Sequence, residues 1–302
     1  MIPNDKKSKL VSIYQYVSDL HDSEWKYVCQ RYSNNAKPEF TDQEIMTIYL
    51  FTTSQQRYYA IKEIYTFAKE YLLSWFPKLP SYQQFNNRLD RLSGSIQQLS
   101  SNLTSSFIPE GCDLGVSLVD SLPIVTCKGR NRSGKVALEI ADKGYCSTKN
   151  MYYHGMKLHA LAFRRKGGLP FPEYLTCTPA SVNDLEAFKS AFGDNLIDRV
   201  VFGDKSYRDK DYFQEKEATN NLTMLTPHKN VKGESDVIRM REQASNDLYS
   251  KAVSTVRQPI ESFFNWINEK TKIQNAQKVR STKGLLLHIF GRIAAAFIYL
   301  IF

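Results

Sequence analysis

Three acidic residues occupy positions where a carboxylate is unusual, and their types favour metal-assisted chemistry on phosphate esters. Asp120 interrupts the apolar run LGVSLVDSLPIV, where an unpaired buried charge would be costly. Asp204 ends the segment VVFGD, and Glu261 stands among apolar neighbours in VRQPIESFFNWI. Mg²⁺ prefers oxygen ligands such as carboxylates. Two such ions can activate an attacking oxygen and stabilise a leaving oxygen when a phosphodiester bond is cut.

Each of these residues also has an ordinary structural interpretation. Asp120 could be a turn or cap residue, and Asp204 could cap the helix that follows it. Glu261 could pair with Arg257, which precedes it by four residues on a helix. For each residue taken singly, the structural interpretation is enough to explain its position. The three residues in the order strand, strand, helix favour one shared site.

The elements that must position these residues follow from hydrophobic periodicity. Residues 1–100 place apolar side chains three and four apart, which predicts helices, and Thr41 with Glu44 predicts a capping box. Beyond residue 111 the pattern predicts three strands, a helix, a strand, a helix, a strand and further helices, at 114–126, 152–165, 172–180, 181–192, 196–207, 208–220, 221–227 and from about 235 to the end. Ser181 or Asn183 is expected to cap the first of these helices, and Pro259 to kink or start a later one.

The fold class predicted from this order is α/β. A mixed sheet flanked by helices is expected in residues 111–302, preceded by an all-α region in residues 1–110. The 302-residue chain carries a formal net charge of +9, which favours an anionic partner such as nucleic acid. Residues 1–110 hold 12 basic against 11 acidic residues, and the remainder holds 28 against 20. Electrostatic contacts with a polyanion are therefore expected mainly in residues 111–302.

The cysteines and the apolar C-terminal segment bear on the compartment. Five widely spaced cysteines without a CxxC pair disfavour a disulfide framework or zinc site and fit a reducing cytoplasm. The segment GLLLHIFGRIAAAFIYLIF is apolar, yet Arg292 would lie near the middle of a membrane anchor, at a cost of about 2.5–3.5 kcal/mol, with His288 adding to it. A buried helix of a globular domain is the better interpretation, and no membrane partner is expected.

Basic residues form two clusters that could contact DNA phosphates. The alternative for each is a solvated surface. The clusters are Lys128, Arg130, Arg132 and Lys135 after the first strand, and Lys270, Lys272, Lys278, Arg280 and Lys283 after the Glu261 helix. Lys157 and His159 are further candidates to face the acidic site, although a single strand histidine is more often structural. In the N-terminal region, a recognition helix for DNA ends could use Asn86, Asn87, Arg88 and Arg91.

Several motifs resemble those of DDE transposases from bacterial insertion sequences, most nearly the insertion-sequence-982 type with an RNase H-like catalytic core. The resemblance is carried by VDSLPI, DKGY at 142–145, YYHGMKLH, GDKSY and VRQPIESFFNWI. Including FTDQEIMTIYLF and LPSYQQFNNRL, it covers most of the chain. GDKSY alone would be weak evidence, whereas the ordered acidic set is fairly specific.

The resemblance implies a DNA transposase that cuts transposon ends and transfers the strands into target DNA. It assigns Asp120, Asp204 and Glu261 as catalytic residues that hold two Mg²⁺ ions, with Mn²⁺ able to substitute. Arg257 matches an arginine that many relatives place near the DNA end. The implied partners are double-stranded DNA, as element ends and as target, and a second copy of the chain in a homodimer on DNA. The implied location is the bacterial cytoplasm, at the nucleoid.

The chain departs from the fuller family signature at two positions. Some relatives carry a tyrosine three residues before the arginine and a lysine seven residues after the glutamate, where this chain has Ser254 and Asn268. These two departures put in doubt the base handling or hairpin chemistry that is attributed to the fuller signature. Two alternatives stay open: an RNase H-like structure-selective nuclease without a joining step, and a catalytically silent DNA-binding protein.

Overall fold

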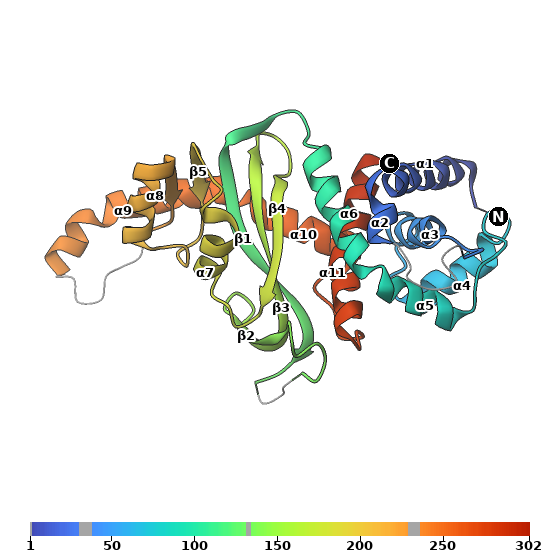
Figure 1. Ribbon diagram of the computed structural model, residues 1–302. Coiled ribbons are helices and arrows are strands. Elements are labelled where there is room, and N and C mark those ends of the chain that lie inside the picture. Colours follow the sequence, from blue (N-terminus) through green and yellow to red (C-terminus); the bar gives the residue numbers. More distant parts are fainter. Residues whose placement is uncertain (1, 30–37, 131–133, 229–235) are drawn as a thin grey trace. The chain divides into compact units, whose positions relative to one another are not determined.

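A computed structural model describes residues 2–29, 38–130, 134–228 and 236–302. The chain divides into two compact units, and each unit is built from more than one segment of the sequence. The helical unit comprises Met1–Ser106, Lys135–Glu139 and Ile267–Phe302, and the sheet unit comprises Phe107–Gly134 and Ile140–Trp266 (Figure 1). The chain therefore passes from the helical unit into the sheet unit, returns briefly at Lys135–Glu139, and returns again for the segment Ile267–Phe302.

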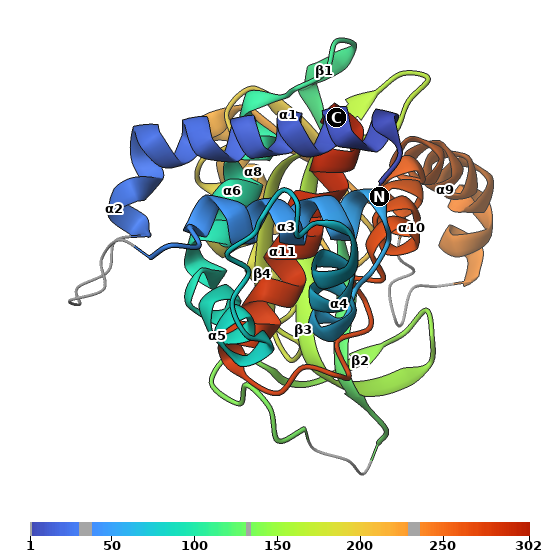
Figure 2. The same ribbon diagram turned by 90° about the vertical axis from the view of Figure 1, so that its right-hand side faces the viewer.

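The helical unit is built from amphipathic helices around a core of aromatic and aliphatic side chains. Its helices in the described part of the chain are α1 (Asn4–Leu20), α2 (Lys26–Val28), α3 (Asp42–Gln55), α4 (Ile61–Tyr71), α5 (Tyr82–Arg91), α6 (Ser93–Ser106) and α11 (Thr282–Ile301), with a π-helical turn, η1 (His21–Trp25), between α1 and α2. The predicted capping box is confirmed: the Thr41 side chain accepts from Glu44 N, and the Glu44 carboxylate accepts from Thr41 N. α1 and α3 lie side by side (Figure 2).

α11 is the central helix of this unit and packs against α6 and α3. By length and composition it could cross a membrane, yet 72% of its most apolar stretch is buried inside the structure. Its buried polar side chains, His288 and Arg292, are bonded: His288 Nε2 lies 2.8 Å from Ile273 O, and Arg292 donates to Thr271 O at 2.5 Å and Tyr59 O at 3.3 Å. The prediction of a buried helix is confirmed.

The helix proposed for DNA-end recognition is α5, and two of its arginines already bind within the unit. Arg88 donates to one Asp42 oxygen at 2.6 Å and Arg91 to the other at 2.5 Å. Asp42 is buried, and these bonds lower its pKa against the opposing effect of burial. Both guanidinium groups therefore anchor α5 to the start of α3. Recognition of DNA ends by this helix stays a prediction.

The sheet unit holds a mixed sheet whose strand order in the described residues is β2-β3-β1-β5-β6, with β4 pairing β3. The strands are β1 (Cys112–Lys128), β2 (Asp142–Cys146), β3 (Met151–Arg165), β4 (Phe171–Pro179), β5 (Arg199–Phe202) and β6 (Leu222–Leu225). β1, β2 and β4 run antiparallel to β3, whereas β5 runs parallel to β1 and to β6. The predicted α/β class, with a mixed sheet flanked by helices after a helical region, is confirmed.

Helices of this unit follow the predicted order and flank the sheet. They are α7 (Asp184–Phe188) with the π-helical turn η2 (Lys189–Gly193), α8 (Lys210–Asn220), α9 (Asp236–Arg257) and α10 (Pro259–Thr271), of which the residues from Ile267 onward belong to the helical unit. Asn183 caps α7 by accepting from Leu185 N at 2.9 Å. α10 begins at Pro259, as expected of a residue that lacks an N–H group.

One face of the sheet carries a compact apolar core. Val119 of β1, Leu161 of β3 and Val201 of β5 pack there against Phe188 of α7 and Phe192 of η2. Successive side chains of a strand point to opposite faces, so Asp120, next to Val119, is directed away from this core. That direction brings it to the side on which α9 ends.

Candidate active site

Asp120 lies within β1, and Asp204 lies in the loop two residues beyond the end of the neighbouring parallel strand β5. The register pairs Leu118 of β1 with Phe202 of β5, and each aspartate follows its member of this pair by two residues. The carboxyl end of a parallel strand is where polar ligand sites gather in α/β sheets. The pairing of β1 with β5 therefore brings these two carboxylates, far apart in the sequence, close enough for their charges to interact.

Glu261 reaches the same neighbourhood through Arg257. The guanidinium donates to Asp120 Oδ2 from Nη1 at 2.9 Å and to Glu261 Oε1 from Nη2 at 2.6 Å. Arg257 ends α9 and Glu261 lies in the first turn of α10, so the predicted i,i+4 pair exists. It does not exclude a shared site, because the same arginine also holds Asp120. Arg257 is 17% exposed and Glu261 is 52% exposed.

The charge state of Asp120 reflects its buried position. Burial raises the pKa of this carboxyl to about 6, and the charges of Asp204 and Asp184 act in the same direction. Arg257 and the hydrogen bond from Ser121 N, at 2.8 Å, oppose this rise in pKa. A carboxyl with a raised pKa near other carboxylates is typical of sites that use acidic groups for chemistry.

Asp184 is a fourth carboxylate that the sequence reasoning missed. It is the first residue of α7, and its Oδ1 accepts from Lys157 Nζ at 3.0 Å and lies 3.8 Å from His159 Nδ1. Burial lowers the pKa of His159 to about 4, so this histidine is neutral at pH 7. The segment SVND predicted only a helix cap, which is why Asp184 went unnoticed. Lys157 and His159 therefore face this additional carboxylate.

Tyr207, the last residue of GDKSY, brings a buried hydroxyl to the acidic residues. It is 1% exposed, and its hydroxyl has no hydrogen-bond partner among the described residues. Burial raises its pKa well above the ordinary value, and the charges of Asp184, Asp120 and Asp204 add to the effect. Gly203 makes room for the ring, because a Cβ at this position would lie 2.9 Å from Tyr207 Cδ2. The motif GDKSY identified Asp204 as a candidate site residue. It did not predict that the tyrosine of the same motif is buried near the acidic residues.

The donor types at this site fit hard divalent cations. Asp120, Asp204 and Glu261 offer only oxygen atoms, and Arg257 already sets a positive charge between two of them. Within the described residues, no three carboxylate, imidazole or thiolate groups lie close enough to hold one ion in this arrangement. Exposed Glu261 would have to leave Arg257 to join the aspartates. Their assignment as catalytic metal ligands stays a prediction.

The predicted DNA-binding residues belong to both units. Lys128 and Arg130 are exposed in the sheet unit, at and just beyond the end of β1. Arg132 lies outside the described residues, and Lys135 is exposed in the segment assigned to the helical unit. Lys272, Lys278 and Arg280 are exposed in the helical unit, while Lys270 is half-buried with its ammonium 4.9 Å from the centre of the Tyr299 ring. DNA contact by each of these residues stays a prediction.

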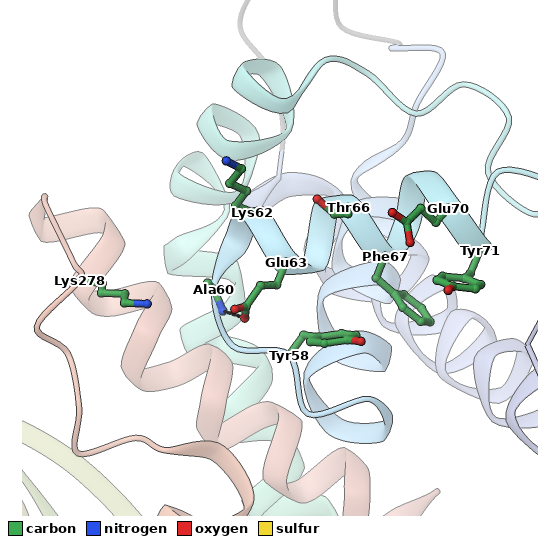
Figure 3. Close-up of a pocket in the computed structure, with 9 residues that line it drawn as sticks. All are labelled: Tyr58, Ala60, Lys62, Glu63, Thr66, Phe67, Glu70, Tyr71 and Lys278. Carbon is green, nitrogen blue, oxygen red and sulfur yellow. Dashed lines mark hydrogen bonds between the residues drawn. The ribbon is translucent and has the colours of Figure 1, made fainter.

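A cavity of about 530 Å³ lies in the helical unit along α4, with Tyr58, Phe67 and Tyr71 on one side (Figure 3). Its charged lining residues are Lys62, Glu63, Glu70 and Lys278, so the two signs are balanced. Balanced charge does not favour a phosphate ligand there. A second cavity, of about 490 Å³, lies in the sheet unit and includes Asp184 and Ser206 in its lining.

The raised pKa of Asp120 predicts that asparagine at this position stabilises the metal-free protein. The folded pKa of about 6 exceeds the ordinary value of 3.8, so stability falls as the pH rises between these values. Above pH 6 the penalty is complete, and Asp120→Asn should remove roughly 1–3 kcal/mol of it. Thermal unfolding in EDTA should show a higher Tm for the variant at pH 7.5 and no difference near pH 4. A wild-type protein that is more stable at pH 7.5 would contradict the prediction.

No curated protein matches the chain. Among solved structures, a crystal structure of a pre-cleavage Mos1 transpososome is similar at 11% identity and a TM-score of 0.20, over 98% of each chain, a likeness too low to support an argument about the fold. The family described as "Transposase DDE domain" matches residues 111–298, which span β1 to α11 and include all three acidic positions. The chain therefore belongs to the transposase DDE domain family.

Proposed function

We propose that the protein is a DNA transposase of the insertion-sequence-982 type that cleaves the ends of its element and transfers the strands into target DNA. The observation that carries the proposal is the bridge from Asp120 through Arg257 to Glu261, with Asp204, in the loop after β5, close enough for its charge to act on Asp120. It lies within the segment that matches the transposase family.

In this proposal Asp120, Asp204 and Glu261 hold two Mg²⁺ ions, for which Mn²⁺ can substitute. When bound, such ions activate the attacking oxygen and stabilise the leaving one. Water attacks the phosphorus at the element end, the bond from phosphorus to O3′ breaks, and a 3′ hydroxyl is released. That hydroxyl then attacks a target phosphodiester, forms a new P–O3′ bond, and frees a target 3′ hydroxyl.

Arg257 has two tasks in this scheme. Its two ion pairs, with Asp120 and Glu261, offset the repulsion between these carboxylates while no other cation is near. A planar guanidinium also matches a phosphate with two parallel hydrogen bonds, so Arg257 can pass from the carboxylates to a phosphate of the DNA end. The arginine thereby positions the backbone beside the acidic groups.

The partners follow from the reaction. Double-stranded DNA serves as element end and as target, and two ends are joined in concert, so a homodimer on DNA is expected. Exposed basic residues supply phosphate contacts that do not read the base sequence; they are Lys128 and Arg130, with Lys135, Lys272, Lys278 and Arg280. Lys270 and Arg132 complete the proposed set, and the cytoplasm, at the nucleoid, is the proposed location.

A joining assay tests the proposal. Purified protein, incubated with duplex ends of its element, a supercoiled target and Mg²⁺, should give both cleaved ends and products covalently joined to the target. Cleavage without joined product would favour the structure-selective nuclease. Binding without cleavage of any DNA, in Mg²⁺ or Mn²⁺, would favour the catalytically silent protein and contradict the proposal.

A further inference from the structure

The sheet-unit cavity lies next to Asp204 and is formed by parts of the chain that the proposed chemistry does not use. Its lining includes Lys143, Tyr145, Tyr152, Lys157, Asp184 and Ser206. Ser206 links the cavity to the acidic site, because its backbone N and its hydroxyl donate to Asp204 Oδ1 at 2.8 and 2.5 Å. A ligand in this cavity would therefore lie beside the loop that holds Asp204.

Two exposed tyrosines form the aromatic part of the cavity. Tyr145 of β2 and Tyr152 of β3 are direct partners across the strands, and their ring centroids are 4.8 Å apart at an interplanar angle of 49°. Tyr145 is 47% exposed and Tyr152 is 39% exposed. Cross-strand aromatic pairs stabilise hairpins, which accounts for their pairing. Pairing of the two rings stabilises the hairpin, but it does not explain why both rings are exposed to the cavity.

Two cations flank the Tyr152 ring. Arg130 Cζ lies 5.7 Å and Lys143 Nζ 5.9 Å from the centre of the Tyr152 ring, and Lys143 also donates to the carbonyl of Arg130. An ammonium has three hydrogen-bond donors, so Lys143 can still donate to a phosphate. Lys157 is already engaged by Asp184 Oδ1 and by Val182 O, at 3.0 and 2.8 Å. The positive charge open to a ligand therefore lies on the tyrosine side.

Gly144 allows the strand that carries Tyr145 to approach the end of β4. A Cβ at this position would lie 2.4 Å from Ala180 O, a distance at which the backbone would have to move. Ala180 also lines the cavity. The small residue therefore lets β2 and the segment after β4 form adjoining walls.

We propose that this cavity binds one nucleotide of an unpaired DNA strand at the cleaved end, with its base against Tyr152 and Tyr145 and its phosphate facing Lys143 and Arg130. The proposal rests on the proposed function, because continuity with Asp204 through Ser206 is what identifies the ligand as DNA. Stacking on an aromatic ring accepts any base, and flanking cations hold the backbone. Binding is therefore expected to depend on strandedness and little on sequence.

Fluorescence anisotropy on the full chain in EDTA, where no cleavage occurs, tests the proposal. The probes are a blunt element-end duplex and the same duplex with a short unpaired extension carrying 2-aminopurine. The wild type should bind the extended probe more tightly and quench its fluorescence. Tyr152→Ala should weaken binding of the extended probe by roughly 5- to 100-fold, the effect of losing one stacked base, and leave blunt-duplex binding unchanged.

Matched variants separate stacking from folding. Tyr152→Leu keeps apolar packing on the hairpin but should lose affinity like alanine, whereas Tyr152→Phe keeps the ring and should bind like the wild type. Tyr174→Ala is the control, because this 45% exposed tyrosine of β4 stacks on Phe192 and does not line the cavity. Wild-type affinity and quenching in Tyr152→Leu would overturn the proposal, as would an equal loss on the blunt probe.

The outcome is distinguishable from failure of the proposed function. If the protein cuts and joins DNA but Tyr152→Leu binds the extended probe normally, only the nucleotide cavity is refuted. If the wild type neither cuts nor joins DNA, yet Tyr152 variants lose the unpaired strand, the cavity stands and the transposase proposal fails.

Discussion

Asp204→Asn, Asp120→Asn and Glu261→Gln are each expected to reduce end cleavage and strand transfer by at least about 1000-fold. Each change removes one negative oxygen donor without altering side-chain size. A loss of roughly 4 kcal/mol of transition-state stabilisation corresponds to this factor, and metal-assisted charge stabilisation amounts to several kcal/mol. Single-turnover assays at saturating DNA, across a Mg²⁺ series, measure the effect.

Two controls make this result specific to the site. Asp211→Asn removes an exposed carboxylate from the first turn of α8 in the same unit and should retain wild-type rates. All three site variants should bind element-end DNA as the wild type does. Asp120→Asn should also be the more stable protein above pH 6, which excludes unfolding as the cause of its inactivity. Joined product from any site variant at above about 1% of the wild-type rate would contradict the assignment, since a 1000-fold loss leaves far less.

Arg292→Met is expected to lower the free energy of unfolding of the helical unit by about 2–4 kcal/mol. Its guanidinium bonds Thr271 O at the end of α10 and Tyr59 O, and lies 5.3 Å from the centre of the Tyr59 ring. Burial lowers the pKa of Arg292, so the buried charge has a cost that methionine removes. The carbonyls left without donors cost more, at about 1–3 kcal/mol each.

Guanidinium chloride unfolding, monitored by the far-ultraviolet circular dichroism of the full chain, measures this effect as a shift in the midpoint. Lys283→Met is the matched control, because Lys283 is exposed in the first turn of the same helix and should change stability by less than about 0.5 kcal/mol. An unchanged midpoint for Arg292→Met would show that the buried charge and its bonds cancel.

Short sequence patterns predicted the structural features that depend only on residues close together in the sequence. The capping box at Thr41, the cap at Asn183 and the helix start at Pro259 all follow from side chains within a few residues of the element they begin. The strand that carries Asp120 was predicted from its apolar run. The strand β2 was missed, because DKGYC is five residues long and carries no alternating apolar pattern.

The composition of the candidate site depends on long-range geometry that local patterns do not contain. The pairing between β1 and β5 brings the loop that carries Asp204 near Asp120, and no residue in either strand encodes that pairing alone. Asp184 and Tyr207 reach the carboxylates from α7 and from the loop after β5. Arg88 and Arg91 were interpreted as possible DNA contacts, but their joint partner, Asp42, lies more than 40 residues away in the chain.

The position of α11 at the centre of the helical unit has a consequence for synthesis. α3 and α6 are made first, yet the helix that buries their apolar faces is the segment Thr282–Ile301. A ribosome must therefore deliver the chain as far as this segment before the core can close. Until then those faces are exposed to chaperones and to other nascent chains. The strands of the sheet end at Leu225, so the sheet can be assembled before the helical unit is complete.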